Sequence, residues 1–176
     1  MKILALAAFA LAAVVGAMSA RAEPQPYQPS GPDALSARSP EDVTRVLRMN
    51  GAAGALKVDE LDAPYFIGEV GGTEVIAVFF GCNVALTRCR RILYGARIDQ
   101  GAADDTQMSD WNLDRPPCRI ERASPGQVWV WRPSYPFAQD TGTEAMADQR
   151  AWLGCLSDFR RLAGAPDAAP AHQAPD

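Results

Sequence analysis

Four cysteines are the residues of this 176-residue chain whose type and spacing could do chemistry. Cys82 and Cys89 have six residues between them, and Cys118 and Cys155 follow further along. Cysteines act as redox groups, metal ligands or disulfide partners. A redox pair usually reads Cys-x-x-Cys, and a zinc site needs closely spaced cysteine pairs or nearby histidines. Neither pattern occurs, and the single histidine is His172 near the C-terminus, so the spacing disfavours both redox catalysis and metal binding.

The first residues indicate the compartment in which these cysteines work. Lys2 precedes an apolar, alanine-rich stretch over residues 3–18, and residues 20–22 read Ala-Arg-Ala. This pattern is typical of a secretory signal peptide, and the stretch is short for a membrane-spanning helix. We expect residues 1–22 to be removed and the mature protein to be periplasmic or secreted, without stable insertion in the membrane.

Charge and composition divide the rest of the chain. The formal net charge of −4 becomes −6 when Lys2 and Arg21 are removed, which argues against nucleic acid as a partner. Residues 23–36 are proline-rich and predict a flexible linker, and residues 165–176 predict a disordered tail. Residues 37–164 are enough for one domain.

The elements that must position the cysteines can be predicted in order. Ser39 as N-cap, Pro40 at the first helical position and Gly51 after the end delimit a helix. Further helices are expected at residues 104–115 and 143–163, and strands at residues 55–60, 65–70, 74–80, 90–98, 118–122 and 127–135. The order helix, four strands, helix, two strands, helix predicts an α+β fold with helices packed on an antiparallel sheet.

These elements favour one pairing of the cysteines among three. Cys82 ends one strand and Cys89 opens the next, which can place them within disulfide reach. Cys118 shares the parity of Ile120 on its strand, and Cys155 lies on the apolar face of the last helix. We expect both bridges to be structural, although burial alone would also explain Cys118 and Cys155 as unpaired core residues.

Two groups of residues are candidates for a binding surface. Trp129 and Trp131 alternate with valines, so both face the same side of their strand, where they either form an exposed aromatic patch or lie beneath a helix. Trp111 and Asn112 are interpreted first as a core residue and a helix cap, and alternatively as a ligand-facing pair with Arg115.

No catalytic constellation is evident in residues 37–164. They contain no histidine and no glycine pattern for phosphate, and Asp104, Asp105 and Asp110 fall on polar helix faces. No cofactor is therefore expected. Two carboxylates could still converge in space, as in glycosidases, which leaves an envelope hydrolase as the alternative function.

Several motifs occur together between residues 34 and 162. They are an aromatic-Gly-Cys turn, a second cysteine, a following strand and a helix that ends in Trp-Asn with a downstream arginine, with two aromatic residues in the final helix. In this sequence these are Phe80, Gly81, Cys82, Cys89, Leu93, Tyr94, Trp111, Asn112, Arg115, Trp152 and Phe159. With these motifs, residues 34–162 resemble the YbjN family.

The resemblance implies a fold similar to class I type III secretion chaperones, a role in regulating sensory transduction and no catalytic residues. Residues 116–119 read Pro-Pro-Cys-Arg where the family usually has Phe-Gly-Arg-Ala, and the proposed partnership of Cys118 and Cys155 is not part of the family pattern. We expect an exported binding or regulatory module that engages a protein or peptide in the bacterial envelope. Its oligomeric state is not indicated by the sequence.

Overall fold

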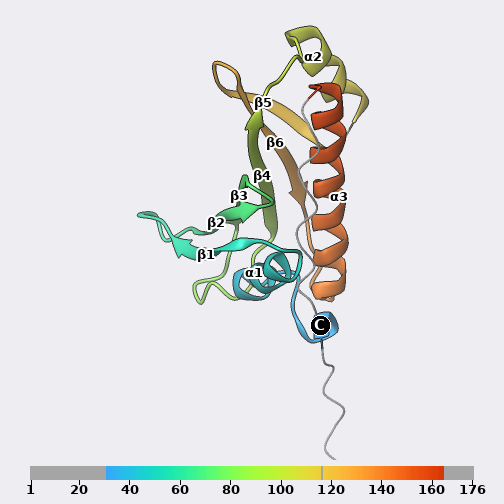
Figure 1. The fold of residues 1–176 in the computed structure, drawn as a ribbon. Coiled ribbons are helices and arrows are strands. Elements are labelled where there is room, and N and C mark those ends of the chain that lie inside the picture. The colour runs from blue at the N-terminus through green and yellow to red at the C-terminus, as the bar shows by residue number, and fades with distance from the viewer. Residues whose placement is uncertain (1–30, 116, 165–176) are drawn as a thin grey trace, which may run out of the picture.

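The structure, a computed structural model, describes residues 31–115 and 117–164, so the predicted signal peptide, most of the linker and the tail lie outside it. It contains one six-stranded antiparallel sheet with three α-helices on one of its faces (Figure 1). The strands are β1 (Ala53–Val58), β2 (Pro64–Val70), β3 (Thr73–Phe80), β4 (Arg91–Asp99), β5 (Arg119–Ser124) and β6 (Gln127–Ser134). The helices are α1 (Pro40–Met49), α2 (Asp105–Asp114) and α3 (Gly142–Leu162), and a 3-10 helix, η1 (Gly31–Ala34), precedes them. This order confirms the predicted α+β fold.

The first four strands form a meander, and the β5–β6 hairpin extends the sheet beyond β4. The spatial order is β1-β2-β3-β4-β6-β5, and every neighbouring pair is antiparallel. The first four strands follow one another in the chain, whereas α2 intervenes before the β5–β6 hairpin. The later strand of that hairpin, β6, pairs with β4 and leaves β5 at the edge.

The helix boundaries follow from side chains that satisfy the first free amides. Ser39 accepts a hydrogen bond from the Asp42 amide at 3.3 Å, as predicted for the N-cap of α1. Asp104 and Gln107 form a reciprocal capping box at the start of α2, and Thr141 and Glu144 form another at α3. The predicted helices are therefore present, with ends within one or two residues of those expected.

Turn chemistry sets the strand boundaries. Gly71 and Gly72 connect β2 and β3 with φ angles of 54° and 77°, which suits a two-residue hairpin turn. The first strand was predicted at residues 55–60 but occupies Ala53–Val58. The reason is the Asp59 carboxylate, which accepts hydrogen bonds from the amides of Leu61 and Ala63 and begins a turn.

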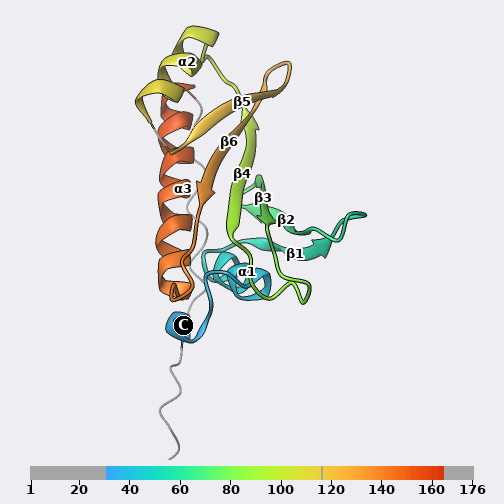
Figure 2. The same ribbon diagram turned by 180° about the vertical axis from the view of Figure 1, so that it is seen from behind.

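The hydrophobic core lies between the sheet and the helices. Burial alternates along β3, so that every second side chain points toward the helical layer. Seen from behind, α3 runs beside β4 and β6, while α1 contacts the β1–β2 end of the sheet (Figure 2). The large, fully buried side chains of this layer include Phe66, Val75, Phe79, Ile92, Tyr94, Val128, Val130, Trp152 and Phe159.

The end of the predicted linker belongs to the folded unit. Residues 31–34 form η1, and the Leu35 side chain is buried. Ser36 forms a β-bridge with Thr141 at the start of α3, and the Gly142 amide donates to the Leu35 carbonyl at 2.9 Å. The proline content of this segment was misleading because Leu35 supplies an apolar anchor and the backbone finds partners far along the chain.

Both expected cysteine pairs are disulfides. Cys82–Cys89 closes the β3–β4 loop with the two Cα atoms 3.8 Å apart, and Cys118–Cys155 links the residue before β5 to α3 with a Cα separation of 6.4 Å. The second bridge links the two layers, because Cys118 lies in the segment that enters β5 and Cys155 lies on α3. Among residues 31–115 and 117–164, no helix has the length and apolar character to cross a bilayer.

Candidate binding surface on the open face of the sheet

The face of the sheet opposite the helices carries an apolar band. Along β3, Ile76 and Val78 point to this side and are only half-buried, while their neighbours face the core. The register places Ile67 and Tyr65 of β2 beside them, and Leu93 of β4 on the other side. The strand β3 therefore carries apolar side chains on both faces, and no described helix covers the second face (Figure 1).

Trp129 and Trp131 lie on this open face, as their alternation with the fully buried Val128 and Val130 requires. Their rings stack with centroids 4.9 Å apart and an interplanar angle of 19°. Both side chains are half-buried, although no described helix packs over them. The structure therefore favours the aromatic patch over the alternative in which a helix covers the pair.

A charged pair, Arg97 and Glu74, lies beside the Trp129 ring. The Arg97 guanidinium lies over the Trp129 ring, with Cζ 6.0 Å from the ring centroid. The same guanidinium pairs with the Glu74 carboxylate on the next strand. Such a cation–π contact at an accessible site contributes about 0.5–1 kcal/mol. Glu74, Arg97 and Trp129 thus form one row of contacts across three adjacent strands.

Trp111, Asn112 and Arg115 are not part of this patch. Trp111 is 6% exposed and meets the Phe159 ring edge-on at 5.7 Å, so it fills the core between α2 and α3. The Asn112 side chain donates to the Ile120 carbonyl at 2.9 Å and accepts from the Ile120 amide at 2.7 Å. Asn112 therefore does not cap α2, as its structural interpretation assumed, but joins this helix to β5.

Arg115 is the accessible member of that trio. Its guanidinium donates to Asp158 at 2.8 Å and lies over the Trp111 ring at 5.2 Å. Trp111, Arg115 and Leu162 line a shallow pocket of about 230 Å³ at this end of the molecule. The pocket and the tryptophan pair lie on opposite sides of the sheet, so the structure separates the two groups of candidate residues.

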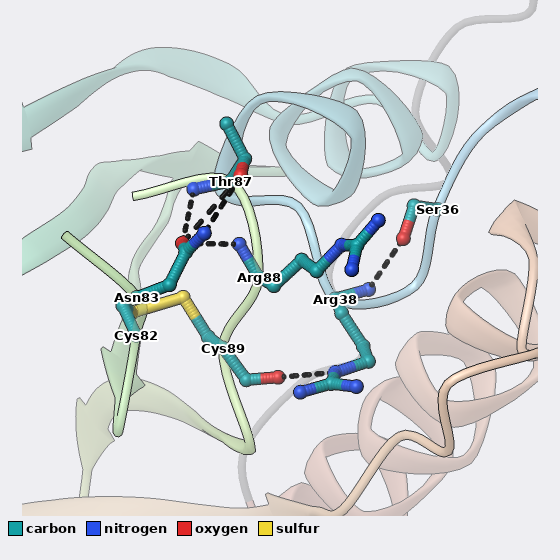
Figure 3. Close-up of a disulfide and its surroundings, with 7 residues drawn as sticks. All are labelled: Ser36, Arg38, Cys82, Asn83, Thr87, Arg88 and Cys89. Carbon is teal, nitrogen blue, oxygen red and sulfur yellow. Dashed lines mark hydrogen bonds between the residues drawn. A yellow bond between two sulfur atoms is a disulfide. The ribbon is translucent and has the colours of Figure 1, made fainter. Parts of the chain in front are cut away.

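The disulfide-closed loop between β3 and β4 is organised by Asn83. Its side-chain oxygen accepts hydrogen bonds from the backbone amides of Thr87 and Arg88 at 2.9 and 3.0 Å (Figure 3). The backbone amide of Asn83 donates to the Arg88 carbonyl at 2.9 Å. The Arg38 Nε donates to the Cys89 carbonyl at 2.9 Å. Arg38 thus lies beside the loop that carries Arg88 (Figure 3), although the two segments are far apart in sequence, and the sequence held no signal for this juxtaposition.

The hydrolase alternative needs carboxylates that converge in a cleft, and none of those in the described part of the chain is buried. No Asp or Glu within residues 31–115 and 117–164 is buried, and Asp148, one of the least accessible, pairs with Arg132 at 3.2 Å. Hydrogen bonds from Thr141 lower the pKa of Glu144, which caps α3 in solvent. Across these same residues, no three His, Cys, Asp or Glu side chains are placed to hold a metal ion.

No protein-family model matches this chain, and no curated protein matches it.

Proposed function

We propose that this chain is an exported, non-enzymatic binding module of the YbjN type, which engages a protein or peptide on the open face of its sheet. The observation that carries the proposal is the stacked pair Trp129–Trp131 beside an apolar band that no described helix covers. The proposed location is the periplasm or the extracellular space. A regulatory role in the bacterial envelope rests on the resemblance of residues 34–162 to the family.

The composition of the open face suits a polypeptide partner. Tryptophan and arginine are enriched among the residues that dominate protein interfaces, and contiguous apolar patches on a protein surface commonly mark binding sites. Here the apolar side chains of Ile76, Val78 and Leu93 lie between two tryptophans at one side and Tyr65 at the other. The stacked indoles lose little conformational freedom on binding because they are already ordered by each other and by Arg97.

The cysteines support the proposed compartment. All four are bonded in pairs, and stable structural disulfides are typical of oxidising environments such as the periplasm or the cell exterior. The predicted signal peptide would deliver the chain there.

Site-specific photo-crosslinking tests the binding face. A photoreactive amino acid at Ile76 on the open face is compared with the same amino acid at Ala147, an exposed position of α3 on the opposite side. In cells that export the protein, we expect discrete protein adducts from position 76 and none from position 147. Trp129→Ala combined with Trp131→Ala should abolish the adducts.

Adducts of equal yield from both positions, or adducts from position 76 that persist without the tryptophans, would contradict the proposal. Circular dichroism of each variant establishes that the sheet is intact, so that a lost adduct reports a lost contact. Edman sequencing or mass spectrometry of the exported chain tests the compartment separately, because retention of residues 1–22 would contradict signal-peptide cleavage.

A further inference from the structure

A second site lies beside the disulfide-closed loop, away from the open face of the sheet. It is a hollow of about 390 Å³ between this loop and the segment that leads into α1. Its lining includes Ser36, Arg38, Ser39, Asp42, Thr87 and Arg88. Figure 3 shows the Arg88 side chain extending from the loop toward the segment that carries Ser36 and Arg38. The volume falls within the range of small-ligand pockets.

The free groups of this hollow are hydrogen-bond donors. The Ser36 hydroxyl oxygen accepts from the Arg38 amide, and the Ser39 hydroxyl oxygen accepts from the Asp42 amide, so the hydrogens of both hydroxyls remain available. Arg38 uses only Nε, toward the Cys89 carbonyl, and retains both terminal nitrogens. Within residues 31–115 and 117–164, the Arg88 guanidinium makes no hydrogen bond or ion pair.

The one carboxylate among the described residues of the lining is already engaged. The Asp42 carboxylate accepts from the Ser36 amide at 3.0 Å and lies 3.9 Å from an Arg45 nitrogen. Two arginines and one carboxylate leave the hollow with a positive balance, in a chain whose formal net charge is −4. A ligand that fits must therefore supply acceptors and negative charge.

The disulfide-closed loop and its hydrogen bonds hold the backbones of both arginines, and the Arg38 guanidinium, in place before any ligand arrives. Two hydrogen bonds join Cys89 to Arg38. The Cys89 amide donates to the Arg38 carbonyl at 2.8 Å, and the Cys89 carbonyl accepts from Arg38 Nε. Arg88 is fixed through both of its backbone groups by Asn83. Cys82–Cys89 ties this loop across its base. Preorganised donors bind a ligand with a smaller entropic cost than mobile ones.

We propose that this hollow binds an oxyanion, the carboxylate or phosphate group of a small ligand, through the guanidinium group of Arg88, with the positive charge of Arg38 beside it. Arginine guanidinium groups recognise both kinds of oxyanion through charge-assisted, often bidentate hydrogen bonds. The hydroxyls of Ser36 and Ser39 donate to the remaining oxygens. This site is independent of the proposed partner on the open face, and either can exist without the other.

The test is a titration of the full chain, with both disulfides formed, first with sodium phosphate and separately with sodium citrate. Amide chemical shifts are measured by NMR at each point, at constant ionic strength. We expect saturable shifts at the amides of Ser39, Thr87 and Arg88 with at least one of the two probes. Saturation by phosphate alone identifies a phosphate ligand, and saturation by citrate alone identifies a carboxylate ligand. Arg88→Gln should weaken binding about tenfold or more, since it removes a charge-assisted contact.

Arg150→Gln is the matched control, because it removes the same charge from an exposed position of α3 outside the hollow. It should leave the affinity unchanged. Arg38→Gln provides a second variant, and Arg88→Gln is the safer of the two because the Arg88 side chain makes no hydrogen bond to the described residues. Shifts that grow linearly without saturation, or an equal loss of affinity in Arg88→Gln and Arg150→Gln, would overturn the proposal.

Discussion

The indole ring of Trp131 on β6 lies against Gly95 of the neighbouring strand β4, at a position where any Cβ atom would come within 2.8 Å of ring carbon Cη2. Because Gly95 has no side chain, the Trp131 ring can occupy this position and stack on Trp129. The candidate binding surface therefore depends on Gly95 in the neighbouring strand. A single methyl group added at this position tests the dependence.

Gly95→Ala should displace the Trp131 ring and disturb its stacking on Trp129. We expect a loss of about 1–3 kcal/mol in the free energy of unfolding, typical of overpacking, together with a changed circular dichroism signal from the coupled indoles. Gly154→Ala is the control, because a Cβ atom at this exposed helical position meets nothing. It should stabilise the protein by about 1 kcal/mol, and equal effects of the two substitutions would contradict the role of Gly95.

Cys118→Ser should lower the thermal unfolding temperature, because Cys118–Cys155 joins α3 to the sheet across 37 residues of chain. The chain-entropy model gives about 4 kcal/mol for a loop of this length and about 2.5 kcal/mol for the Cys82–Cys89 loop. Thermal unfolding with and without reductant measures both. The wild type should lose more stability on reduction than Cys118→Ser does, and identical responses would show that this bridge does not form in solution.

Asn112→Ala should loosen the contact between α2 and β5. The variant loses two hydrogen bonds to the Ile120 backbone and leaves that amide and carbonyl without their partner, at a cost of about 1–3 kcal/mol. Hydrogen exchange at the Ile120 amide should accelerate. Leu113→Ala, at a neighbouring position that is 75% exposed, should leave this exchange rate unchanged.

The buried Tyr94 hydroxyl should make the stability of the protein depend on pH in the alkaline range. Burial raises the pKa of the Tyr94 hydroxyl above its ordinary value of 10.0. The unfolded chain therefore ionises first, so this contribution to stability is complete below about pH 10 and declines as the pH rises further.

Tyr94→Phe should remove the Tyr94 part of this decline, as measured by urea unfolding across the alkaline range. Tyr135→Phe alters a tyrosine that is 63% exposed and should retain the decline of the wild type. If both variants declined alike above about pH 10, the ionisation of Tyr94 would not be the cause.

The fold was predictable where local chemistry and periodicity agree. Ser39 and Pro40 mark the start of α1, and the inward parity of Cys118 and Cys155 led to the observed bridge. The buried face of β4 consists of Ile92, Tyr94, Ala96 and Ile98, which are two residues apart as one side of a strand requires. In each case the spacing within one element is enough, because side-chain direction is fixed by the helical or strand repeat.

The remaining features depend on contacts between distant segments. Nothing in the periodicity of β6 says that it lies between β4 and β5. The parity of Trp129 and Trp131 gave their common side but not whether a helix covers it, since that depends on where all three helices pack. Arg38 and Arg88 are fifty positions apart and meet only through the Cys89 backbone and the closed loop.

The strand order also decides when the core can be completed as the chain emerges with its N-terminus first. β1 to β4 pair in chain sequence, so this meander and the Cys82–Cys89 bond involve short loop closures and can form while the rest of the chain is still emerging. The β1–β2 end of the apolar face, which includes Phe66, is contacted by α1, whereas Tyr94 on β4 stacks on Trp152 of α3 and lacks this cover until the last element arrives. Closure of the core and formation of Cys118–Cys155 therefore coincide, and the nascent chain is most exposed to misassociation just before its final helix docks.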